Sequence, residues 1–196
     1  MTNNVKWIII HGTDYAKSVL PDQFIACNGW HKDRRFPVSS LGYFTGYHRL
    51  ITGRKNYQAR LDTDEGSHCN QQVNGISLNF QSLGVCVGFD GDIEQMDVVE
   101  YDLLQKQVWA WQDQYGITNE YVKFHRFFSP QKTCAGSLLG DTWLKTLLTR
   151  PIATPIVPKP PESMCIAEEK IITEQKEKIS WLEQFIAWVS SRFPIG

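Results

Sequence analysis

Two histidines and one cysteine in this sequence are the residue types that could together hold a transition metal. His11 ends the apolar run Val5–His11, His125 ends the short run Tyr121–His125, and Cys134 follows after a loop. In an open α/β sheet, side chains at the ends of strands gather in one crevice. Two imidazoles and one thiolate suit Zn²⁺, which in catalytic sites keeps three protein ligands and one open position.

Tyr47 and Lys132 carry the groups that hydrolysis at such a metal would need. The metal lowers the pKa of water and polarises a carbonyl, while a general base and a cation for the oxyanion complete the set. The sequence spacing does not by itself bring these segments together. Each residue also has an ordinary structural interpretation: a strand-end histidine can be structural, a buried cysteine can be inert packing, and Lys132 can be a solvated surface residue.

The elements that would position these residues alternate between strands and helices. Apolar, β-branched runs predict strands at Val5–His11, Tyr47–Ile51, Tyr57–Leu61, Leu83–Phe89 and Tyr121–His125, with a turn at Gly53–Asn56 inside a hairpin. Helices are predicted at Pro21–Trp30, Asp97–Tyr115 and Gly140–Leu148. This order predicts an α/β fold with a central mixed β-sheet flanked by helices.

The segment Asp97–Tyr115 has the clearest helical pattern. Asp97 can cap its start, Glu100 completes a pattern like a capping box, and Gly116 fits the stop. One apolar stripe recurs at steps of three and four residues and consists of Tyr101, Leu104, Val108, Trp111 and Tyr115.

The composition changes after the α/β domain, which is predicted to span residues 1–150. Residues 151–162 form a proline-rich linker, which favours a stiff connection. Residues 163–196 are predicted to form an amphipathic C-terminal helix. Its mixed charges favour self-association or docking on the domain, whereas Trp181 and Trp188 favour contact with a membrane or envelope.

Charge and cysteine content exclude several classes of function. A formal net charge of −1 gives no support for a general nucleic-acid binder, which would show a basic face. The five cysteines are scattered and form no CxxC pair, so a disulfide framework is not expected. No signal peptide and no run long enough to span a bilayer is recognised, so we expect synthesis in a cytoplasm.

Six short motifs, in the same order, resemble those of the type 2 N-acetylmuramoyl-L-alanine amidase family, which includes small phage amidases and peptidoglycan recognition proteins. The likeness covers residues 5–148. The motifs are the strand with His11 (IIIHGT), Trp30–Lys32 (WHK), Gly46–Ile51 (GYHRLI), Gly66–His68 (GSH), Asn79–Val85 (NFQSLGV) and the loop from His125 to Cys134.

This resemblance implies a role for each matching residue. It implies one Zn²⁺ per chain with the ligands His11, His125 and Cys134, and it implies Tyr47 and Lys132 as the catalytic residues. At other motif positions, His68 and Asn79 are predicted to touch substrate in the groove wall. His48 is predicted to be structural or to lie behind the ligands.

The activity implied is hydrolysis of the amide between the lactyl group of muramic acid and L-alanine in peptidoglycan. The resemblance further implies a phage endolysin that reaches the wall once a holin opens the membrane, with a bacterial or prophage enzyme as the alternative. Two other functions stay open: a binding module for muropeptides without catalysis, and a zinc peptidase acting within the stem peptide. Binding-only relatives typically lose the cysteine ligand, which this chain keeps. Ala135, where proline is usual, and the long segment Gly66–Ser82 depart from the family pattern.

Overall fold

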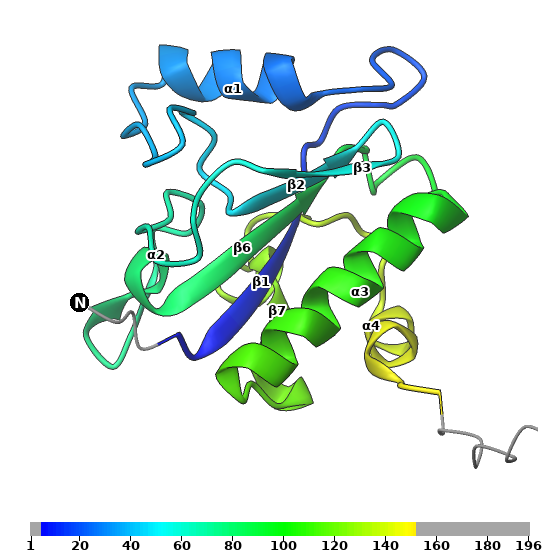
Figure 1. Cartoon of the computed structure of the whole chain (residues 1–196). Helices are drawn as coiled ribbons and strands as arrows, with labels where there is room; N and C mark the ends of the chain where they lie inside the picture. The colour runs from blue at the N-terminus through cyan, green and yellow to red at the C-terminus, as the bar shows by residue number, and fades with distance from the viewer. Residues whose placement is uncertain (1–4, 152–196) are drawn as a thin grey trace, which may run out of the picture. The chain divides into compact units, whose positions relative to one another are not determined.

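The computed structural model describes residues 5–151, and its centre is a five-stranded mixed sheet in the order β3-β2-β6-β1-β7 (Figure 1). The strands are β1 (Trp7–Gly12), β2 (Arg49–Thr52), β3 (Lys55–Gln58), β6 (Ser82–Val87) and β7 (Val122–Phe124). β1 runs parallel to both β6 and β7, β2 runs parallel to β6, and β3 is antiparallel to β2 at the edge. A separate small hairpin joins β4 (Gln72–Val73) to β5 (Ile76–Ser77).

In the described part of the chain, four α-helices surround the sheet: α1 (Phe24–Asp33), α2 (Leu78–Gln81), α3 (Val98–Tyr115) and α4 (Asp141–Leu148). Two short 3₁₀ turns, η1 (Asn119–Tyr121) and η2 (His125–Phe127), flank β7. The predicted fold class, an α/β arrangement with a central mixed sheet flanked by helices, is confirmed.

The two faces of the sheet bury different sets of residues because successive side chains of a strand point to opposite sides. Ile8, Ile10 and Val85 join the core formed with α3 and α4. Cys86 packs on the other face, in a cluster with Phe24 and Cys27 of α1. His11 and Gly84 alternate with the residues of the first set, so they lie on the α1 side, away from the main core.

Helix α3 matches its prediction except in one contact. The carboxylate of Asp97 accepts hydrogen bonds from the backbone N–H groups of Val99 and Glu100, and Gly116 ends the helix at φ 66°. The carboxylate of Glu100 pairs with Lys17 Nζ at 3.1 Å, a contact with a distant segment that the capping-box pattern did not predict.

The predicted helix Pro21–Trp30 is shifted along the chain. α1 begins only at Phe24 and continues past Trp30 to Asp33. The late start follows from the contacts of Gln23, which is buried: its N–H donates to Thr52 Oγ1 and its side-chain amide donates to the carbonyl of Tyr15.

The predicted strands also differ in their ends. Gly53 and Arg54 both have positive φ and close a two-residue hairpin turn, so the predicted four-residue turn is shorter and Lys55 already pairs with Thr52. In the run Tyr121–His125, only Val122–Phe124 is a strand, and His125 opens a 3₁₀ turn.

The predicted linker, apart from Pro151, and the predicted C-terminal helix lie outside the described residues, as does Cys165. The four cysteines in the described part of the chain are free thiols and buried. Within residues 5–151, no helix combines the length and the apolar character that crossing a membrane requires.

Candidate metal centre and its cleft

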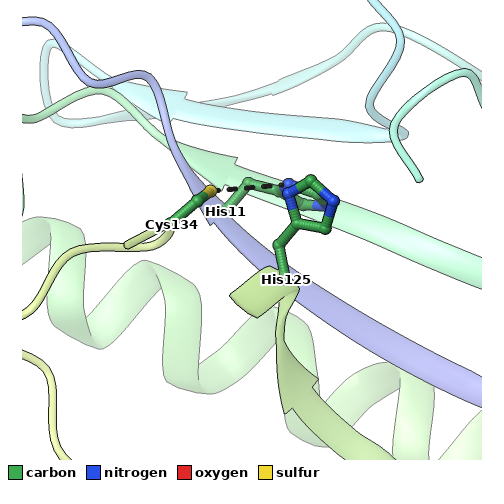
Figure 2. Close-up of side chains that lie close together, drawn as sticks. All are labelled: His11, His125 and Cys134. Atoms are coloured by element: carbon green, nitrogen blue, oxygen red, sulfur yellow. Dashed lines mark hydrogen bonds between the residues drawn. The ribbon is translucent and has the colours of Figure 1, made fainter. Parts of the chain in front are cut away.

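His11, His125 and Cys134 come together at one end of the sheet (Figure 2). Their candidate ligand atoms all lie within 4.8 Å of one another, and all three residues are buried. Cys134 Sγ is 3.8 Å from His11 Nδ1, and the ring centroids of His11 and His125 are 4.5 Å apart. Figure 2 shows the three side chains pointing toward one another from three different segments of the chain.

The sheet explains why the two histidines meet. β1 and β7 are parallel and pair Ile10 with Phe124. The residues that follow this pair, His11 and His125, therefore lie side by side at the carboxyl ends of the two strands. His125 is held further by Ser129, whose hydroxyl lies 3.4 Å from His125 Nε2 and whose N–H donates to the carbonyl of His125.

Arg126 holds the loop that carries Cys134. Its guanidinium donates to the carbonyls of Thr133, Gly136 and Leu139, and its N–H donates to the carbonyl of Cys134 at 2.8 Å. Each carbonyl so engaged fixes a different point of the loop. The peptide bond between Cys134 and Ala135 is cis.

Asp92 holds the same loop from the other side. Its carboxylate accepts hydrogen bonds from the Thr133 hydroxyl and from the Ser137 N–H, both at 2.6 Å. These hydrogen bonds lower the pKa of Asp92, because they favour the ionised form. Sequence reasoning missed both Asp92 and Arg126. Asp92 lies outside the recognised motifs, Arg126 lies inside the last one without a predicted role, and the partners of both are defined only by the folded loop.

The three clustered residues fit a zinc ion. Tetrahedral zinc with ordinary bond lengths holds a nitrogen and a sulfur ligand roughly 3.6 Å apart, close to the observed separation. Burial, together with nearby His68, His125 and Lys132, keeps the pKa of His11 well below its usual range. Burial lowers the pKa of His125 to about 4, so both imidazoles are neutral, the form that binds metals.

Without a bound metal, the thiol of Cys134 keeps its proton at neutral pH. Burial raises the pKa of Cys134 to about 12, although the N–H of Gly12 donates to Sγ at 3.4 Å. A free thiol with this pKa is a poor nucleophile at neutral pH. A bound cation reverses this preference because a coordinating thiol loses its proton.

The cluster opens into a cavity of about 530 Å³. Tyr47 and Lys132 line it together with the three clustered residues. The ring of Tyr47 lies 5.0 Å from that of His11, and burial raises the pKa of the Tyr47 hydroxyl well above its usual value. The wall also contains aromatic, charged and amide side chains, namely Tyr15, Trp30, Phe36, Asp14, Arg34, Asn70 and Gln71.

His68 lies beside a candidate ligand. Only 8% of His68 is exposed, and its Nδ1 is 3.0 Å from His11 Nε2. It also lines the cavity, so its predicted contact with substrate stays a prediction.

Asn79 holds the loop on which His68 sits. Its side-chain oxygen accepts from the N–H groups of His68 and Cys69, at 2.8 and 2.7 Å. It does not line the cavity of the metal cluster but a smaller neighbouring one.

His48 is fully buried and bonded at both nitrogens. The N–H of Gly84 donates to Nδ1 at 3.0 Å, and Nε2 donates to the carbonyl of Asp64 at 3.1 Å. The rings of His48 and His68 also form an edge-to-face contact, with their centroids 5.8 Å apart. His48 therefore supports the region behind the cluster through the backbone of β6.

A larger cavity, of about 640 Å³, lies between β7 and α4. Its lining contains neither histidine nor cysteine. The residues suited to metal binding and hydrolysis are instead collected in the cleft at the strand ends.

Solved structures with the same fold were found, although no protein-family profile and no curated protein sequence matches the chain. The amidase LysC from Clostridium intestinale URNW is 22% identical, with a TM-score of 0.57 over 73% of this chain and 84% of that one. The amidase AmiD of E. coli, in complex with anhydro-N-acetylmuramic acid-L-Ala-D-γ-Glu-L-Lys, is 17% identical, with a TM-score of 0.55 over 78% and 62%.

The recognition protein PGRP-SA of the bumblebee is 18% identical, with a TM-score of 0.55 over 78% of this chain and 86% of that one. The chain therefore has the fold shared by N-acetylmuramoyl-L-alanine amidases and peptidoglycan recognition proteins.

Proposed function

We propose that this protein is a zinc-dependent N-acetylmuramoyl-L-alanine amidase, which cleaves the amide between the lactyl group and L-alanine of peptidoglycan. The observation that carries the proposal is the buried group of His11, His125 and Cys134 at the base of a cleft that Tyr47 and Lys132 also line. Two imidazoles and one thiolate leave one position of a tetrahedral zinc open for substrate or water.

The similar structures support the substrate class. LysC is named as an amidase of this type, and AmiD is described with a muramyl peptide as substrate. The fold alone includes recognition proteins such as PGRP-SA, so it does not decide between catalysis and binding. The complete set of metal-binding side chains favours catalysis in this chain.

Zinc held by these residues would polarise the scissile carbonyl and make water acidic enough to attack near neutral pH. Lys132, on the wall of the cleft, would place its ammonium group at the oxygen that becomes negative in the transition state. Tyr47 keeps its proton because burial raises the pKa of its hydroxyl. We therefore assign Tyr47 to orienting the attacking water by a hydrogen bond rather than to accepting a proton.

The remaining wall residues suit a muramyl peptide. A cleft of about 530 Å³ lies within the usual range of small-ligand sites. Trp30 and Tyr15 offer flat apolar surfaces, and their rings lie 5.3 Å apart. Arg34 offers a cation for the carboxylates of a stem peptide, and Asn70 and Gln71 offer amide groups.

The proposed biological role is that of a phage endolysin. Such an enzyme is made in the host cytoplasm and degrades the wall after a holin opens the membrane. Residues 163–196, after the proline-rich segment 151–162, would add self-association, docking or envelope contact to the catalytic domain of residues 1–150.

The test is the mass of fragments released from purified peptidoglycan by the full-length chain, with and without a chelator. Free stem peptides that begin at L-alanine, lost on chelation and restored by zinc, are the expected products. Cleavage inside the peptide would identify a zinc peptidase instead. Binding to peptidoglycan without release of fragments would identify a recognition module.

A further inference from the structure

A chain of hydrogen bonds runs from the candidate ligand His11 into the interior. His11 Nε2 lies 3.0 Å from His68 Nδ1, and His68 Nε2 lies 3.4 Å from the hydroxyl oxygen of Ser82. The Ser82 hydroxyl in turn contacts the carbonyl oxygen of Leu78 at 2.5 Å. All four residues are buried.

The last member of the chain sets the direction of every proton. The carbonyl of Leu78 can only accept, so the Ser82 hydroxyl must donate to it. Ser82 can then only accept from His68, which places the proton of a neutral His68 on Nε2. The Nδ1 atom of His68 is left as an acceptor, so His11 donates from Nε2. His11 Nδ1, which faces Cys134 Sγ, therefore carries a lone pair.

The position of the His68 ring is fixed by two glycines. A Cβ atom added at Gly84 would lie 2.7 Å from this ring, and one added at Gly66 would lie 2.5 Å from it. The ring thus occupies space that any other residue at either position would fill. Asn79 holds the backbone of His68 by the hydrogen bond to its N–H. This slot leaves the ring little freedom to turn away from His11.

We propose that His68, oriented by Ser82, is a positioning residue that fixes the tautomer and ring orientation of His11 for metal binding. This inference rests on the proposed function, because it takes His11 as a zinc ligand. Partners of this kind raise the affinity of a histidine ligand by holding its ring in the binding orientation. In this role, His68 acts through His11 and need not touch substrate.

The affinity test compares zinc binding, measured by competition with a chromophoric chelator, among full-length variants. His68→Phe fills the slot but offers no acceptor, and we expect its zinc affinity to fall about 10- to 100-fold. His68→Gln offers an amide oxygen to His11 and an amide N–H to Ser82, so it should recover part of this loss. Ser82→Ala should lower the affinity less than His68→Phe, because the direct partner of His11 remains.

Val108→Ala is the matched control for lost stability. Val108 is fully buried in the core formed with α3 and lies outside the cleft. Its removal leaves a small cavity and should lower the melting temperature while zinc affinity stays unchanged. If His68→Phe and Val108→Ala lose zinc affinity equally at equal melting temperature, the loss reflects stability and the inference is overturned.

A spectroscopic test uses the zinc-free wild-type chain with ¹⁵N-labelled histidine. We expect protonated Nε2 and bare Nδ1 on both His11 and His68, with a scalar coupling across the N–H···N bond between them. A proton on Nδ1 of His68 would overturn the inference whatever the variants do.

The outcomes separate this inference from the proposed function. If the wild-type chain binds no zinc, both fail. If the wild type binds zinc and releases stem peptides, but His68→Phe binds zinc equally well, only the inference fails. In that case, a raised KM with unchanged zinc affinity would assign His68 to substrate contact instead.

Discussion

Cys134 Sγ lies 3.8 Å from His11 Nδ1, although 123 positions separate the two residues in the chain. The contact joins the end of β1 to a loop that Arg126 and Asp92 hold on either side. Each side chain has a further partner: His11 Nε2 lies 3.0 Å from His68 Nδ1, and Cys134 Sγ accepts a hydrogen bond from the N–H of Gly12. With His125, the two residues form a group whose ligand atoms are close enough to share a metal ion, and the following predictions start from this contact.

Removal of a ligand should abolish both zinc binding and peptidoglycan hydrolysis. We expect Cys134→Ala and His125→Ala to lose more zinc affinity than the roughly 10- to 100-fold that is typical when only a hydrogen-bond partner of a ligand is removed. Cys69→Ala is the control, since Cys69 is also a buried thiol but lies outside the metal cluster. Metal content by mass spectrometry and release of stem peptides are the measurements. Full activity in either ligand variant would reject the assignment.

Loss of the Lys132 ammonium should separate metal binding from turnover. Lys132→Ala should keep one zinc per chain and lose about 10²- to 10³-fold in kcat, because the oxyanion loses a charged partner. Lys106→Ala is the matched control, since Lys106 is exposed on α3 and pairs with the exposed Asp102 of the same helix. Steady-state kinetics on a soluble muramyl peptide give the result. An unchanged kcat would exclude Lys132 from the chemical step.

The zinc-free protein should lose stability in mild acid. Burial lowers the pKa of His31 and of His48 to about 4, whereas an unfolded histidine keeps its usual value of about 6.5. Between these values the unfolded chain binds protons that the native chain does not. The free energy of unfolding should therefore fall by up to about 1.4 kcal/mol per pH unit for each such histidine as the pH drops from 6.5 to 4.

Urea unfolding of the protein, measured at several pH values after a chelator has removed zinc, tests this dependence. The variant His31→Gln retains a possible acceptor for the Gly46 N–H, which donates to His31 Nδ1 at 2.9 Å, and should show a shallower dependence. Equal free energies of unfolding at pH 7 and pH 5 would contradict the assignment of neutral, buried histidines.

A glycine in place of Arg35, just after the end of α1, should stabilise the protein. Arg35 is exposed and has φ 58°, a left-handed conformation that favours glycine. Arg35→Gly should raise the free energy of unfolding by about 1 kcal/mol, since it removes the unfavourable contact of Cβ. At Arg34, where φ is −80°, the same change should destabilise the protein. Thermal and urea unfolding of the two variants provide the comparison, and an equal effect at both sites would refute the argument.

Local sequence patterns determined most of the fold. The β-branched run Ile8, Ile9 and Ile10 predicted a buried strand, and the structure confirms it as part of β1. The stripe of Leu104, Val108 and Trp111 predicted the buried side of α3, because helical spacing places these residues on one face. Asp97 and Gly116 predicted its ends through hydrogen bonds and backbone geometry that are local to the chain.

The sequence also supplied the candidate metal residues, through their types and their resemblance to a known family. It placed His11 and His125 next to strand ends, but their meeting depends on the parallel pairing of β1 with β7. Such pairing is set by contacts between distant segments, which no local pattern encodes.

Only the tertiary structure decided the surroundings of His68. The sequence suggested a residue of the groove wall, and His68 does line the cavity. The folded chain alone shows that its ring also lies against His11, in a slot left open by Gly66 and Gly84. The Ser82 contact arises because β6 and the loop that carries His68 lie side by side. Residue types and local spacing thus determined which side chains could do chemistry. The packing of distant segments decided which nitrogen of each ring faces its neighbour.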